Sequence, residues 1–120
     1  MTLHELEVMV RDHDGVAVID LVGDINSSAD DALDAGYDEA SAVGGDIALN
    51  FTNVDYINST GIALIVGLLA RARRHSIEVR AFGLSEHYRG IFEVTRLADF
   101  MTIADDEDGA TGTAERNDDV

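Results

Sequence analysis

The sequence predicts a single α/β domain with a mixed, mostly parallel β-sheet of about five strands, an N-terminal hairpin and three to four helices. After two strand-like segments, segments whose apolar residues recur three or four positions apart, as in helices, alternate with further strand-like segments. Strands that alternate with helices favour parallel pairs joined by crossovers. The length of 120 residues suffices for one core and is too short for two.

The first part of the chain predicts the hairpin. Residues 3–10 alternate as a half-buried strand does, and residues 16–22 are apolar and largely β-branched, with turn formers between the two runs. Gly23-Asp24-Ile25-Asn26 closes the second strand. Either Asn26 or Ser27 is a suitable N-cap for the helix that follows.

Residues 28–43 predict an amphipathic helix with an acidic outer face. The side expected to be buried consists of Ala29, Leu33, Gly36, Tyr37 and Ala40. The other side carries Asp30, Asp31, Asp34 and Asp38. Gly44-Gly45 ends the helix. Residues 46–54 then predict a third strand, and residues 55–58 a short connector.

A second helix is expected to run to about His75, with Asn58 or Ser59 as its N-cap. Its expected buried stripe is Ile62, Ile65, Val66, Leu69 and Ala72. Three arginines in its last turn lie where the helix dipole is negative, which is favourable.

The rest of the chain predicts a strand over 77–84, a third helix capped by Ser85, and a last short strand over 100–104. One face of this helix holds Tyr88, Ile91, Phe92 and Thr95. Another face holds Arg89, Glu93 and Arg96, at spacings that allow ion pairs. We therefore expect the domain to span residues 1–105, followed by an acidic, flexible tail over 106–120 with at most one helical turn.

Composition excludes several functions. The net charge is −16, and all eight basic residues are arginine, so nucleic acid and anionic lipid are repelled at long range. The absence of cysteine excludes disulfides, thiol catalysis and thiolate metal sites. The four histidines show no metal-ligand spacing and are expected at the surface, so we expect neither a metal nor a cofactor. With no targeting signal or apolar span in view, we expect a cytoplasmic protein.

The strand, connector and helix over residues 50–67 form the most informative segment. Hydroxyl side chains and a glycine open the helix, where free N–H groups and the positive end of the dipole favour an anion. A phosphate on Ser59 or Thr60 would be stabilised there, and Gly61 keeps the backbone accessible. A serine at such a place is also an ordinary N-cap, and the physical argument alone favours that simpler role.

The sequence Asn58-Ser-Thr-Gly-Ile62 resembles the phosphorylation loop, Asp-Ser-Ser/Thr-Gly-Leu/Ile, of STAS-domain proteins of the anti-sigma-factor antagonist type. Two further segments resemble the same family. Leu21-Val-Gly-Asp-Ile-Asn26 is similar to its early Gly-Glu-Leu-Asp, and Phe92-Glu-Val-Thr-Arg-Leu-Ala-Asp-Phe100 to its late Leu-Phe-x-x-Thr/Ser-Gly-Leu. The three segments occur in the family's order and cover residues 3–105.

This resemblance implies a regulatory protein and not an enzyme. In the family, the unphosphorylated antagonist captures an anti-sigma factor that is also a serine kinase, which frees the sigma factor. The kinase phosphorylates the residue matching Ser59, with Thr60 as second choice here, and a PP2C-type phosphatase reverses the step. The implied partner-binding residues are Asp24, Asn26, Ser27, Tyr56, Asn58, Ser59, Thr60, Gly61, Ile62 and Leu64.

Three positions depart from the family pattern, because Asn26 and Asn58 replace aspartates and Arg96 replaces a glycine. The two asparagines remove negative charge near the phosphate acceptor. They leave open a different kinase, weak phosphorylation, a non-phosphorylated STAS scaffold, or a STAS subunit of a lipid-transport ABC system. A small-ligand or hydrolytic enzyme also remains as an alternative, although the nucleophile elbow of a hydrolase needs glycine where Ile57 stands.

The charge is unevenly distributed along the sequence. Acidic residues gather on the first helix and in the tail, while residues 56–70 carry no charge. We expect an apolar, hydrogen-bonding interface over that uncharged segment. The many aspartates with no lysine also suggest either a salt-rich cytoplasm, where surface acids keep a protein hydrated, or a GC-rich genome.

Overall fold

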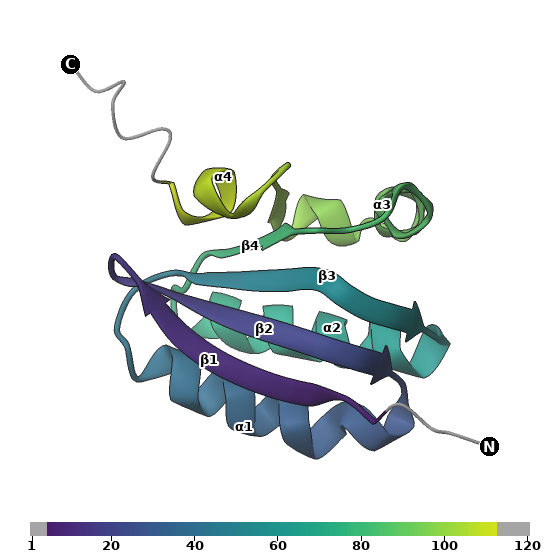
Figure 1. Ribbon diagram of the computed structural model, residues 1–120, viewed down its shortest axis with the longest axis horizontal. Coiled ribbons are helices and arrows are strands. Elements are labelled where there is room, and N and C mark those ends of the chain that lie inside the picture. Colours follow the sequence, from purple (N-terminus) through teal and green to yellow (C-terminus); the bar gives the residue numbers. More distant parts are fainter. Residues whose placement is uncertain (1–4, 113–120) are drawn as a thin grey trace.

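The computed structural model describes residues 5–112 and has the predicted order of strands and helices (Figure 1). The strands are β1 (Glu7–His13), β2 (Val16–Ile25), β3 (Ile47–Ile57), β4 (Val79–Phe82) and β5 (Thr102–Ile103). The α-helices are α1 (Asp30–Ser41), α2 (Ser59–Arg74), α3 (Glu86–Val94) and α4 (Glu107–Thr111). Two single 3-10 turns, η1 (Ser27–Ala29) and η2 (Leu97–Asp99), precede α1 and follow α3.

The five strands form one sheet in the order β1-β2-β3-β4-β5. β1 and β2 pair antiparallel as the predicted hairpin, and the other three pairs are parallel. This confirms the mixed, mostly parallel sheet. Because β2 and β3 are parallel, their carboxyl ends leave the sheet at the same edge, with Ile25 opposite Ile57.

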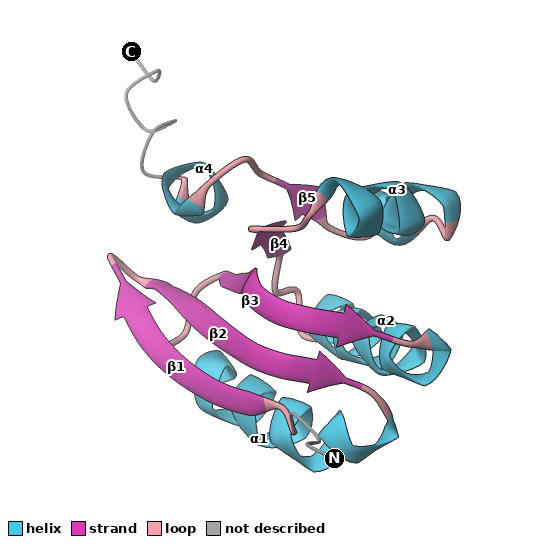
Figure 2. Cartoon of the chain, turned by 45° about the vertical axis from the view of Figure 1, so that its right-hand side comes forward, coloured by secondary structure: helices cyan, strands magenta, loops and turns pink. Residues whose placement is uncertain are grey.

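Helices cover the two faces of the sheet unequally (Figures 1 and 2). α1 and α2 lie side by side along one face, over the main core. The strand residues in that core alternate: Ala17, Ile19 and Leu21 from β2, and Ile47, Leu49 and Phe51 from β3. α4 packs on the opposite face over a smaller cluster made by Val16, Val18, Ala48, Phe82 and Ala110. The alternation of the strands supplies apolar side chains to both faces.

α3 lies near the carboxyl half of β3, past the end of the short strand β4 (Figure 2). Its Phe92 is fully buried and meets the ring of Phe51 edge to face, with 5.7 Å between the ring centres. Ser85 caps α3 by accepting a hydrogen bond from the N–H of Tyr88, as predicted.

Several predicted boundaries are wrong because sheet pairing overrides local sequence. β2 continues to Ile25 and β3 to Ile57, so the connector before α2 shrinks to Asn58 alone. The two strands stay paired despite register shifts after Asp20 and Gly23. The polar residues at the ends of these strands give no sign of this continued pairing. The fourth and fifth strands are shorter than predicted: β4 runs over residues 79–82 and β5 over residues 102–103.

Two predictions about helix faces also need correction. Val66 was expected in the buried stripe of α2 but is 47% exposed, since Leu68 takes a buried position of that stripe. The ion pairs of α3 form with residues outside the helix: Arg89 with Asp105 at 3.3 Å, and Arg96 with Asp99 at 2.7 Å. Arg96 has a φ of 69°, the left-handed backbone that glycine adopts without strain.

Residues 107–111, within the segment expected to be flexible, form α4 and pack on the sheet. Glu107 receives hydrogen bonds from Arg11 at 2.7 and 2.8 Å and contacts Nδ1 of His13 at 2.7 Å. His13, expected at the surface, is therefore half-buried and in contact with a carboxylate. Arg80 donates to the carbonyl of Ala110, which is fully buried. The rest of the predicted tail, 113–120, and the N-terminal residues 1–4 lie outside the described residues.

Candidate functional site

The candidate site lies where the carboxyl ends of β2 and β3 meet the start of α2. The N–H of Asn58 donates to the carbonyl of Ile25 at 3.2 Å and ties the two chain segments together. Gly61 packs directly on the same carbonyl, because a Cβ at position 61 would lie only 2.7 Å from the carbonyl carbon of Ile25. Only glycine allows α2 to begin so close to the end of β2.

Two asparagines fix the backbone turns on either side of this contact. Oδ1 of Asn58 accepts from the N–H of Gly61 at 2.8 Å and caps α2. Oδ1 of Asn26 accepts from the N–H of Ser28 at 3.0 Å and from its hydroxyl at 2.7 Å, so it caps η1. Both caps are among those predicted. The two residues that depart from the aspartates of the family pattern thus make the same kind of cap that an aspartate would make.

Ser59 and Thr60 are exposed in the first turn of α2, a helix of 16 residues. The first N–H groups of a helix have no partner further back in the helix, and they carry the positive end of its dipole. Asn58 occupies one of these groups, that of Gly61. A negatively charged group on either hydroxyl would lie next to the others, which chemically favours an anion at this place.

The other predicted site residues surround this turn. Asp24 lies opposite Tyr56 in the paired strands, half-buried, and the tyrosine is 53% exposed. Ser27 is exposed at the start of η1, which contacts α2. Ile62 and Leu64 are half-buried and pack against the core. The tertiary structure therefore brings the predicted residues of the early and middle motifs to one edge of the sheet.

One hydrogen bond that supports the candidate site was not predicted from the sequence. The hydroxyl of Tyr88, on α3, accepts a hydrogen bond from the N–H of Ile57 at 2.9 Å and fixes the last residue of β3. The sequence predicted Tyr88 on the packed face of its helix, but no local signal relates it to a residue 31 positions earlier.

The side chains with shifted pKa values lie away from this turn. The hydrogen bonds from Arg11 lower the pKa of Glu107 to about 2, with His13 adding to the effect. Burial opposes ionisation of Asp20, but hydrogen bonds from Arg11 and Asn50 outweigh it and lower the pKa of Asp20. Burial raises the pKa of Tyr37. These groups belong to the packing of α4 and α1 and not to the edge that holds Ser59.

Known proteins share this architecture and this sequence pattern. The sequence model of the STAS domain family matches residues 7–110, which is most of the chain. The chain belongs to the STAS domain family. The match includes β1 to β5 and reaches into α4.

Individual proteins resemble this chain over part or most of its length. The anti-sigma-B factor antagonist of Staphylococcus aureus is 38% identical over 58 residues, which are 48% of this chain and 54% of that protein. A crystal structure of an anti-sigma factor antagonist from Mycobacterium paratuberculosis has a TM-score of 0.75 at 20% identity, covering 93% of this chain and 95% of that one. The phosphorylated form of the Bacillus cell fate determinant SpoIIAA has a TM-score of 0.67 at 20% identity, covering 90% and 99%.

Two structural observations on this STAS domain concern other kinds of site. Within residues 5–112, no three histidine, aspartate or glutamate side chains gather as the ligands of a metal ion would. None of the helices in the same part of the chain is both long and apolar enough to cross a bilayer.

Proposed function

We propose that this STAS domain is an anti-sigma-factor antagonist whose affinity for its partner is switched by phosphorylation of Ser59. The observation that carries the proposal is the place of Ser59, exposed in the first turn of α2 within the family's motif. The similarity to an anti-sigma-B factor antagonist supports the class of partner, over about half of each chain.

In this proposal, the unphosphorylated domain binds an anti-sigma factor that is also a serine kinase, and so releases the sigma factor. The partner covers the turn from Asn58 to Leu64, with Asp24, Asn26, Ser27 and Tyr56 beside it. A PP2C-type phosphatase restores the binding form. The whole cycle takes place in the cytoplasm, where sigma factors meet RNA polymerase.

The switch follows from charge. A phosphate adds roughly two negative charges to a surface that is uncharged from residue 56 to residue 70. The helix N-terminus stabilises that charge in the free protein, whereas a bound partner would have to desolvate it. Phosphorylation therefore favours the free antagonist over the complex.

The test compares wild type, Ser59→Ala and Ser59→Asp as baits in lysate of the source organism, with mapping of the phosphorylated residue. Wild type and Ser59→Ala are expected to capture an anti-sigma kinase, and Ser59→Asp to lose it. Val43→Asp is the control, because it adds the same charge on an exposed residue in the turn after α1, at the opposite end of the strands.

A second candidate, a STAS scaffold that is never phosphorylated, is favoured by Asn26 and Asn58, which replace the acidic residues of the motif. Both side chains act as caps, a role that needs no phosphate chemistry. Equal capture of one partner by all three Ser59 forms, with no phosphate on Ser59 or Thr60, would support the scaffold and contradict the switch.

A further inference from the structure

An apolar groove runs between the second half of α2 and η2. Its lining residues are Val66, Leu69, Ala70, Arg73, Leu97 and Phe100, and its volume is about 150 Å³. Phe100 is 56% exposed and Val66 is 47% exposed, so two large apolar residues face solvent here. The groove shares Leu69, Arg73 and Phe100 with a more polar cleft of about 490 Å³ beside β4 and β5.

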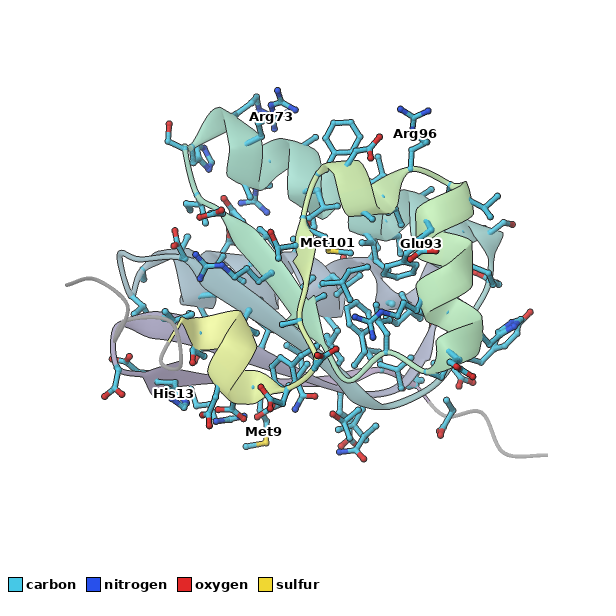
Figure 3. All side chains as sticks on the ribbon, turned by 90° about the horizontal axis from the view of Figure 1, so that it is seen from above. Met9, His13, Arg73, Glu93, Arg96 and Met101 are labelled. Carbon is cyan, nitrogen blue, oxygen red and sulfur yellow. The ribbon has the colours of Figure 1, made fainter. Side chains whose placement is uncertain are left out.

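The groove is bordered by Arg73, one of the two arginines in residues 5–112 that have no ion pair. Five of the seven arginines in residues 5–112 form ion pairs with carboxylates, and Arg73 and Arg74 form none. The guanidinium of Arg73 lies over the ring of Phe100, 5.7 Å from its centre. Figure 3 shows Arg73, on α2, and Arg96, before η2, along the same border of the molecule.

These features point to the chemistry of an occupant. Exposed apolar side chains favour an apolar partner, and aromatic residues next to arginine are typical of the strongest contacts in protein interfaces. Unpaired guanidinium groups favour carboxylates. A second copy of this chain is a poor occupant, because two molecules of net charge −16 repel each other.

We propose that the groove binds an amphipathic, acidic segment of the anti-sigma factor, with an apolar side chain against Phe100 and a carboxylate at Arg73. This rests on the proposed function and adds a second contact to it. Val66 follows Ser59 by seven residues, about 10 Å along the helix. An interface of standard size, about 800 Å² on each partner, reaches that far, so one partner covers both places.

The contact also orients the partner. On the other side of α2, Asp30 and Asp34 of α1 line a second groove together with Arg71, which pairs with Asp34 at 3.5 Å. Among the described residues, the side of α2 that faces α1 thus carries Asp30 without an ion pair, the helix is uncharged up to Ala70, and the groove side carries Arg73 without an ion pair. A partner with its acidic segment at Arg73 fits in one direction only, which places its kinase site at Ser59.

The test uses the anti-sigma factor identified by the capture experiment, purified, with affinities measured by calorimetry. Phe100→Glu and Arg73→Glu are each expected to weaken binding about tenfold or more. The loss in Arg73→Glu should shrink as KCl is raised. A third variant, Phe100→Ala, removes the ring without adding charge, and its loss of affinity should persist at high KCl. Val94→Glu is the matched control, since Val94 is an 83% exposed apolar residue outside the groove and should change nothing. Thermal unfolding verifies that each variant is folded.

Each contrary outcome has a distinct meaning. If Ser59→Asp loses the partner while both groove variants bind within about twofold of wild type, the groove proposal is wrong and the switch stands. If wild type binds no anti-sigma factor, both proposals are wrong. If light scattering shows a wild-type dimer that Phe100→Glu dissociates, the occupant is a second copy and the groove proposal is again wrong.

Discussion

Replacing Gly61 by alanine tests the packing that holds α2 against the end of β2. The added Cβ would lie 2.7 Å from the carbonyl carbon of Ile25 and 3.1 Å from its Cγ2, whereas carbon atoms normally pack at about 3.5–4.0 Å. The start of α2 must therefore move by about 1 Å. Overpacking of this kind costs about 1–3 kcal/mol.

The same movement weakens the hydrogen bond from Asn58 N–H to the Ile25 carbonyl, a loss of about 0.5–1.5 kcal/mol. The helix preference of alanine over glycine returns up to about 1 kcal/mol. The net destabilisation is about 2 kcal/mol, which lowers the Tm of a domain of this size by about 8 °C.

Thermal and urea unfolding measure the change directly. Gly67→Ala is the matched control, because it lies in the same helix, is exposed, and has nothing within 4 Å of the added Cβ. That variant is expected to gain about 0.5–1 kcal/mol. If Gly61→Ala is as stable as Gly67→Ala, the close approach of α2 to Ile25 is not a feature of the folded protein, and the geometry described for the start of α2 is refuted.

Three further predictions follow from other contacts. The pKa of Glu107 in the folded protein is about 2, below its ordinary value of 4.5, because Arg11, and to a lesser extent His13, hydrogen-bonds to the carboxylate. The contribution of ionised Glu107 to the stability of the fold is therefore complete above pH 4.5 and is lost as the pH falls through 2. Urea unfolding of Glu107→Gln should therefore show lower stability at pH 7 and a flatter decline between pH 4.5 and 2 than wild type, and parallel declines would contradict the ion pair. Asn58→Ala should cost about 1 kcal/mol through loss of the α2 cap, while Asn58→Asp keeps the cap, and thermal unfolding of the two variants separates these outcomes. Arg96→Gly should raise the Tm, because the residue has a left-handed φ of 69°, and an unchanged or lowered Tm would show that its exposed ion pair with Asp99 outweighs the strain.

Local sequence was sufficient where the physical signal is itself local. Asn26, Asn58 and Ser85 are helix caps, as their side chains and the patterns after them predict. The period of the apolar residues in α1 placed Tyr37 and Ala40 inside and its aspartates outside. The order of strands and helices follows from the same periodicities, and the order of the motifs identified the family.

Boundaries and partners between distant segments were beyond such reasoning. The sheet continues to Ile57 because β2 offers a paired backbone, and polar residues such as Asp55 give no sign of it. The position of α4 depends on side-chain contacts across 94 and 96 residues, from Glu107 to His13 and Arg11. An acidic C-terminal segment looks solvated until these partners are known.

The sequence by itself determined the family, the order of the strands and helices and the place of Ser59 at the start of α2, because periodicity, capping and a short motif are properties of neighbouring residues. Only the tertiary structure decided that Gly61 rests on Ile25, that α4 covers the second face of the sheet, and that Phe100 and Arg73 border one groove. Each of these joins residues separated by tens of positions. Such contacts depend on how the twisted sheet brings its edges and crossing helices together, and no local pattern encodes that arrangement.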